Sequence, residues 1–201
     1  MGRGGERTPE GLAQIGDHLP RGGRYARIMP KSYLMSRKWA LTDRFAITDE
    51  SGMPQFEVQG RFAFSKRLSI RDSAGAEVAV ISRPGLLTRY EILVGSQLAT
   101  VRPRGFLGQR FEIDSAAGRL EARGNFSGRQ YSVTRGGMQA AAVTQLRTLR
   151  ERFAVEITDG EDPVLMLAVV LVIEIIRDDR QRSAAAGASS AAAGGSAAAG
   201  G

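Results

Sequence analysis

Residues 162–177 read DPVLMLAVVLVIEIIR, an almost wholly apolar stretch in a chain that is otherwise rich in arginine and glycine. Ten apolar residues run without interruption from Val164 to Ile173, and Glu174 is the only charge between residues 164 and 176. Asp162 is a good N-cap and Pro163 suits the first turn, so the stretch predicts a helix that begins at residue 163. A helix that is apolar on every face must be buried on every face.

A bilayer and the interior of a protein barrel are the two environments that would bury such a helix. A bilayer crossing takes about 20 apolar residues, whereas the thirteen residues here span roughly 20 Å. We therefore predict a core helix threaded through a barrel. A short transmembrane or re-entrant anchor, and a buried strand favoured by the valine and isoleucine content, are the alternatives.

The sequence before this helix repeats a strand-like unit in steps of 20 to 23 residues. Each unit alternates polar and apolar residues, and a short turn with Asp or Gly leads to a second alternating run. With a first strand near residues 32–38, the pattern predicts an antiparallel meander, closed as a barrel or folded as a sandwich. Because a barrel of this size has a lumen to fill, we predict a mainly β fold, a closed antiparallel barrel of about twelve strands around a central hydrophobic C-terminal α-helix. The large residues of the repeat are Phe45, Leu68, Tyr90, Phe111, Tyr131 and Phe153.

This whole pattern resembles the LURP-one-related family, which shares the Tubby C-terminal-like fold with phospholipid scramblases. The matching residues are Tyr33-Leu34-Met35, the run from Asp43 to Asp49, the repeated Arg-aromatic-x-Ile units, and Gly160 to Pro163 before the helix. The resemblance covers residues 30–180 and implies a β-barrel around a central helix, with no established catalytic activity. Tubby relatives bind phosphoinositides through basic residues, but no such position can be matched here residue by residue.

The two ends of the chain differ in composition from the region between them. Residues 1–30 are rich in Gly and Arg and predict a flexible basic leader, whereas residues 183–201 contain only Ala, Gly and Ser. We therefore expect a barrel domain over residues 31–180 and a disordered tail over residues 181–201.

Composition excludes several kinds of chemistry. The chain has 201 residues with no cysteine and one histidine, His18, in the leader, so thiolate catalysis and Cys-based zinc sites are excluded. No catalytic residue, metal or cofactor is predicted. The carboxylates at 159, 161 and 162 are explained by helix capping, with a calcium site as the alternative. Glu174 is expected to pair with Arg177 near the barrel mouth, and a buried functional carboxylate is the alternative.

Charge is unevenly divided between the two sets of connections in the meander. Basic residues outnumber acidic residues by 28 to 21 in the whole chain, and by 16 to two in the six segments that join successive hairpins. A cationic rim interleaved with apolar residues suits anionic headgroups. The alternatives are pairing of these arginines with Glu57, Glu91, Glu112 or Glu121 across strands, and a phosphate backbone. The candidate lipid-binding residues are Arg37, Lys38, Trp39, Lys66, Arg67, Arg102, Arg104, Phe106, Arg110, Arg147 and Arg150.

These observations predict a binding or scaffolding module without enzymatic activity. Its expected partner is an anionic phospholipid or another protein, rather than nucleic acid, and its association with a membrane is expected to be peripheral. The chain is therefore predicted to be cytoplasmic and to reach the membrane surface. A protein-interaction or structural barrel, and scramblase-like activity, are the alternatives.

Overall fold

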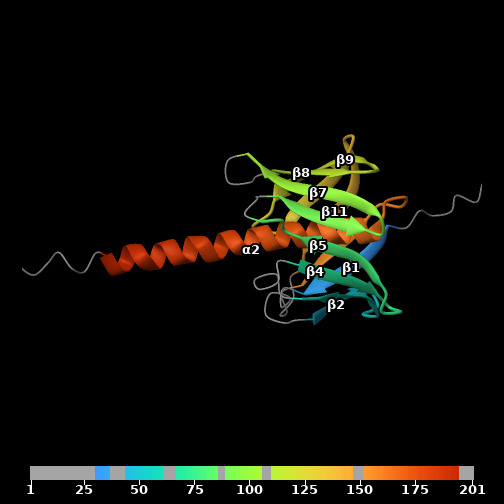
Figure 1. The fold of residues 1–201 in the computed structure, drawn as a ribbon, viewed down its shortest axis with the longest axis horizontal. Helices are drawn as coiled ribbons and strands as arrows, with labels where there is room; N and C mark the ends of the chain where they lie inside the picture. The colour runs from blue at the N-terminus through green and yellow to red at the C-terminus, as the bar shows by residue number, and fades with distance from the viewer. Residues whose placement is uncertain are drawn as a thin grey trace, which may run out of the picture.

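The structure is a computed structural model, and it describes residues 30–36, 44–60, 67–85, 89–105, 110–146 and 152–194. Within these residues, twelve antiparallel strands form a closed barrel around one helix (Figure 1). The predicted fold class is thereby confirmed. The strands are β1 (Lys31–Ser36), β2 (Arg44–Asp49), β3 (Pro54–Gln59), β4 (Arg67–Asp72), β5 (Glu77–Ser82), β6 (Tyr90–Val94), β7 (Gln97–Arg104), β8 (Arg110–Ser115), β9 (Gly118–Asn125), β10 (Gln130–Arg135), β11 (Met138–Gln145) and β12 (Arg152–Ile157), and the helix is α2 (Pro163–Gly194).

The barrel is closed by the pairing of its first and last strands. Each strand pairs with the next along the chain, and β1 pairs with β12 in a register that runs from Lys31↔Ile157 to Ser36↔Arg152. This closure decides between the two predicted arrangements, because a sandwich would leave β1 and β12 as edges.

Polar and apolar residues alternate along the strands, and the apolar side chains point into the barrel. Leu68, Tyr90, Phe111, Tyr131 and Phe153, the large residues of the sequence repeat, are all buried, and Phe45 packs partly buried against the same core. Their neighbours along each strand point outward, as the two-residue period of a strand requires. The sequence repeat is therefore the inner surface of the barrel.

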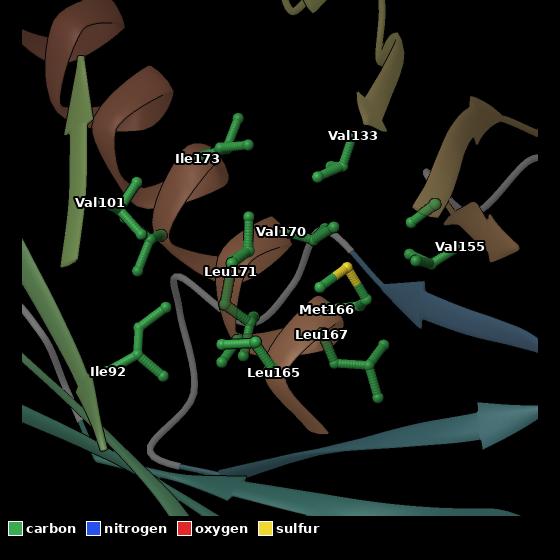
Figure 2. Close-up of a cluster of buried hydrophobic side chains, with 14 of the residues drawn as sticks. Ile92, Val101, Val133, Val155, Leu165, Met166, Leu167, Val170, Leu171 and Ile173 are labelled. Carbon is green, nitrogen blue, oxygen red and sulfur yellow. The ribbon is translucent and has the colours of Figure 1, made fainter. Parts of the chain in front are cut away.

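Helix α2 occupies the lumen. The Asp162 carboxylate accepts hydrogen bonds from the backbone N–H of Val164 (2.8 Å) and Leu165 (3.3 Å), which confirms the predicted cap. Every residue from 165 to 178 is buried. Figure 2 shows Leu171 on the side of the helix that faces Ile92 and Val101, while other side chains of the helix turn toward Val133 and Val155. A helix apolar on every face is thus buried against wall on every side.

The helix is longer than the sequence predicts. It leaves the barrel and continues to Gly194, whereas a disordered tail was expected from residue 181 (Figure 1). Alanine has the strongest helix propensity, and the buried segment supplies the nucleus that an isolated alanine-rich tail lacks. The expected leader over residues 1–29 and the last residues of the tail, 195–201, lie outside the described residues.

The topology gives the barrel two chemically different ends. At the turn end, where α2 begins, carboxylates lie at or beside the strand ends, as at Asp49, Glu50, Asp72 and Asp114. At the exit end, where α2 leaves, the strands begin or finish close to arginine, as at Arg44, Arg67, Arg104, Arg110 and Arg152. The described strand ends that flank the two sets of connections therefore lie at opposite ends of the barrel, as the sequence predicts.

Candidate functional site

The exit end is the candidate site because the excess of basic residues found in the sequence lies at this end of the barrel. Four of the candidate lipid-binding residues, Arg67, Arg102, Arg104 and Arg110, lie on described strands at or near this end. The others lie outside the described residues, and they are Arg37, Lys38, Trp39, Lys66, Phe106, Arg147 and Arg150.

These four arginines have acidic partners on the outer face of the wall. Arg67 lies 3.6 Å from Glu77, Arg102 lies 3.6 Å from Asp114, and Arg104 lies 2.9 Å from Glu112. Arg110 lies between Glu112 (3.5 Å) and Glu121 (3.1 Å). The cross-strand pairing that the sequence offered as an alternative is therefore present in the structure.

The other glutamates of that alternative are paired as well. Glu57 lies 3.8 Å from Arg44, and Glu91 lies 3.2 Å from Arg89. The hydrogen bond from Arg123 lowers the pKa of Glu121 below its ordinary value. Since these arginines are 40% or more exposed on their side chains, each pair is worth at most about 1 kcal/mol. Each of these exposed ion pairs is weak enough for its arginine to exchange one acidic partner for another.

A buried cluster of charges lies inside the barrel mouth at the exit end. Glu174 is fully buried, and its Oε2 lies 3.2 Å from Arg177, the partner that the sequence predicted. The same oxygen accepts a 2.9 Å hydrogen bond from Nε of Arg129, which sequence reasoning missed. Arg129 is 45 residues away in the chain, and no local spacing connects the two.

The turn before β10 explains how Arg129 reaches the lumen. Its backbone N–H bonds to the carbonyl of Phe126 (3.2 Å), and its φ of 50° is in the left-handed region, where non-glycine residues are uncommon. Its guanidinium also bonds to Gln145 (3.1 Å) and stacks 5.2 Å from the centre of the Phe153 ring. The ion pair and the stacking hold this backbone conformation in place.

Some buried polar atoms of this charged cluster form no hydrogen bond. Among the described residues, four of its buried atoms have no hydrogen-bond partner: Arg129 Nη2, Tyr131 Oη, Glu174 Oε1 and Arg177 Nε. Burial raises the pKa of Glu174 and, more strongly, that of Tyr131. With Asp178 bonded to Arg177 at 2.9 Å, two guanidinium groups face two carboxylates. The ion pair of Glu174 with Arg129 joins α2 to the barrel wall.

A groove lies at the same end of the barrel, between α2 as it leaves the barrel and the ends of β5, β6 and β7. We call it the exit groove, and its volume is about 940 Å³. The wall contributes Arg83, Tyr90, Pro103 and Gly105, and the helix contributes Ile176, Asp179, Arg180, Arg182, Ser183 and Ala184. The groove therefore combines guanidinium groups with one carboxylate and several apolar residues.

Asp179 is the acidic member of the exit groove. It lies 3.7 Å from Arg182, and its partial burial raises its pKa above the ordinary value. The guanidinium of Arg83 lies 5.6 Å from the centre of the Tyr90 ring, within cation–π range.

The turn end carries a smaller hollow of about 420 Å³, whose lining includes Lys31, Tyr33, Asp49, Glu50 and Gln55. Glu161 forms a two-bond pair with Arg135 (3.0 and 2.9 Å), and Asp162 caps α2, so these carboxylates are used within the protein. In the described part of the chain, no group of three His, Asp or Glu side chains could hold a metal ion.

Within the same residues, no helix combines the length and the apolar character that a membrane crossing requires.

The chain is similar to one protein family and to a solved structure of the same fold. A family model described as LURP-one-related matches residues 31–174. The X-ray structure of a protein from Arabidopsis thaliana superposes with a TM-score of 0.59 and 18% sequence identity, covering 75% of this chain and 93% of that chain. Likeness at this identity shows the fold alone. No curated protein matches the sequence.

Proposed function

The chain belongs to the LURP-one-related family, and we propose that it is a non-enzymatic binding module whose exit end associates with anionic phospholipid surfaces. The observation that carries the proposal is the charge difference between the two ends of the barrel. Arginines begin or finish strand after strand at the exit end, whereas acidic residues outnumber basic ones at the described strand ends and connections of the turn end.

The filled lumen supports a binding role rather than a catalytic one. Barrels that act on small ligands commonly place them in the mouth or the interior, but here the side chains of residues 165–178 occupy the interior. The buried carboxylate of Glu174 is held by two arginines. It is therefore a structural group.

Association would proceed by exchange of ion-pair partners at the surface. The exposed pairs of Arg67, Arg102 and Arg110 are weak, and each arginine near an anionic leaflet is worth about 1 kcal/mol. The contributions of several such arginines on one rim would add up to a measurable affinity for an anionic membrane. Because the attraction is electrostatic, it falls as salt is raised.

Co-sedimentation of the full chain with vesicles tests this function. We expect binding to phosphatidylcholine vesicles that contain phosphatidylserine, loss of that binding at high salt, and none to phosphatidylcholine alone. The variant Arg102→Glu/Arg104→Glu/Arg110→Glu should lose most of the binding. A matched control at the turn end, Lys31→Glu/Arg71→Glu/Arg119→Glu, makes the same change in net charge and should retain it.

Two results would contradict the proposal. Equal losses in the two triple variants would mean that net charge alone governs binding. Retention of binding by the Arg102/Arg104/Arg110 variant, with its barrel intact by circular dichroism, would mean that the exit end is not the binding surface.

A protein partner is the second candidate, and the projecting part of α2 favours it. Residues 181–187 are exposed and helical beyond the barrel (Figure 1), so another protein could pack along them. Removal of residues 185–201, which keeps every lining residue of the exit groove, would abolish capture of such a partner and leave vesicle binding unchanged. Scramblase-like activity stays a prediction of the family resemblance.

A further inference from the structure

The strands of the barrel wall are paired to different extents, and we propose that the wall opens locally between β1 and β2 while β1 stays attached to β12. Opening at this β1–β2 junction uncovers apolar side chains that line the lumen, so the junction is a conformational device built into the barrel. The inference concerns the wall rather than the charged rim, and it does not depend on the proposed function.

The β1–β2 junction has the shortest register of the barrel. In the described part of the chain it comprises two positions, Tyr33↔Asp49 and Leu34↔Thr48. Every other pair of neighbouring strands shares four to six positions over the same described residues. The junction is therefore the weakest line of backbone pairing around the wall.

The two strands diverge toward the exit end, where residues of both are described. The same register would place Met35 opposite Ile47 and Ser36 opposite Ala46, but these described residues are not paired. The register of β2 against β3 also shifts between Ile47 and Thr48, so β2 carries a β-bulge at the step where its pairing with β1 ends. A bulge bends its strand and increases the local twist, which favours separation of β2 from β1 beyond this step.

The same two strands also part at the turn end. The hollow of about 420 Å³ lies between residues 30–33 on one side and the turn that follows β2 on the other. The carboxylate of Asp49, the last residue of β2, accepts hydrogen bonds of 2.6 to 3.0 Å from Ser51, Met53 and Gln55. These bonds fasten the end of β2 within its own hairpin and add nothing to its pairing with β1.

The other neighbour of β1 is held along the whole strand. All six residues of β1 are in register with β12, so β2 is the neighbour from which β1 separates first. Local opening of a native protein takes place where backbone pairing and buried contacts are fewest. The side chains that it uncovers include Met35 and Ile47, which are 1% and 0% exposed in the closed barrel.

Cysteine labelling measures this opening, because the chain has no cysteine of its own. Ile47→Cys and Ile113→Cys replace fully buried isoleucines of β2 and β8, so the two variants are matched in residue type and burial. Iodoacetamide reaches either thiol only when the wall opens, and mass spectrometry follows the reaction. We expect the Ile47→Cys variant to react at least about tenfold faster in native buffer, after each rate is divided by the rate of the same variant in urea.

Two further measurements separate local opening from a loss of global stability. The labelling rate of Ile47→Cys should depend weakly on added urea, since local opening exposes little surface, whereas that of Ile113→Cys should rise steeply, as global unfolding does. Val155→Cys replaces a fully buried residue of β12 that lies opposite Tyr33. It should react as slowly as Ile113→Cys, because β1 and β12 stay paired.

A disulfide across the junction gives an independent test. Leu34→Cys/Thr48→Cys joins directly opposite residues of β1 and β2, and Ser132→Cys/Ala142→Cys joins those of β10 and β11 as the matched control. The spacing of opposite residues in antiparallel strands suits a disulfide. Oxidation of the first pair should slow amide hydrogen exchange of residues 31–36 and 44–49 by at least about tenfold, and oxidation of the control pair should leave it unchanged.

The results that would overturn the proposal are distinct. Equal native labelling rates for Ile47→Cys and Ile113→Cys, or a steep urea dependence for Ile47→Cys, would show that the junction opens only by global unfolding. Fast labelling of Val155→Cys would show that β1 leaves both neighbours. Hydrogen exchange that does not respond to the disulfide of Leu34→Cys/Thr48→Cys would likewise overturn the assignment. None of these readouts involves vesicles, so the proposed function stands or fails separately.

Discussion

Glu174 is a buried carboxylate inside the mouth of a hydrophobic barrel, and its environment explains why it is tolerated there. It interacts with Arg129 from the wall (2.9 Å) and Arg177 from its own helix (3.2 Å). A buried ion pair is weak evidence for net stability, because desolvation offsets most of the attraction, but removal of one partner leaves the others uncompensated. Loss of any one of these three side chains would therefore leave a buried charge without its partner.

Removal of the Glu174 carboxylate should be severely destabilising. We expect Glu174→Ala to lower the free energy of unfolding by about 3–5 kcal/mol, because two buried guanidinium groups lose their counter-charge. Urea denaturation of the full chain measures this. Glu57→Ala, which breaks an exposed pair with Arg44 at 3.8 Å, is the control and should cost less than about 1 kcal/mol.

The same residue should make stability depend on pH in a defined direction. Burial raises the pKa of Glu174 despite its two arginines, so the native protein holds this proton more tightly than the unfolded chain. Its contribution is then fully present below the unfolded pKa and is lost as pH rises through the folded pKa. We expect the stability of the native protein to fall relative to Glu174→Gln over this window, by urea denaturation at a series of pH values. A difference that grows in the opposite direction would contradict the assignment.

Helix α2 is the element that organises the molecule, and its two halves are stabilised differently. Residues 165–178 are helical because the barrel buries every face, whereas the exposed residues 181–187 depend on alanine-rich propensity and on the helix already formed before them. Its start is set by a single side chain, since Asp162 bonds to two of the first free N–H groups.

Loss of this cap should be measurable apart from any change in the core. We expect Asp162→Ala to cost about 1 kcal/mol of unfolding free energy, the usual value for an N-cap carboxylate. Asp159→Ala, an exposed carboxylate of the same connection, is the matched control and should be neutral by the same denaturation assay. Equal effects would mean that the negative charge near the helix, rather than the hydrogen bonds, is responsible.

At the scale of the whole molecule, closure by β1 and β12 turns a series of local hairpins into one cooperative unit. Each strand pairs with its neighbours in sequence except at this seam, where residues 31–36 meet residues 152–157. The helix that fills the barrel follows the last strand directly, so the lumen is complete only when the seam is closed.

Amide hydrogen exchange should separate the enclosed and projecting parts of the molecule. We expect amides of residues 165–178 to exchange only through global unfolding, and those of residues 181–187 to exchange orders of magnitude faster, because the latter are exposed helix. Mass spectrometry of peptic fragments measures both. Similar protection in the two segments would show that something covers the projecting helix, in favour of a partner or self-association.

The local pattern of the chain was sufficient to predict the barrel and its central helix. Polar–apolar alternation, the recurring large residue and an all-apolar segment each depend on neighbours in sequence, as strand and helix periods do. The Arg129–Glu174 contact and the exit groove depend instead on residues brought together by barrel closure, across 45 residues for the contact and from Arg83 to Ala184 for the groove. The helical continuation to Gly194 likewise depends on a nucleus held in place by the barrel. Distances of this kind are fixed by packing, which a one-dimensional pattern does not contain.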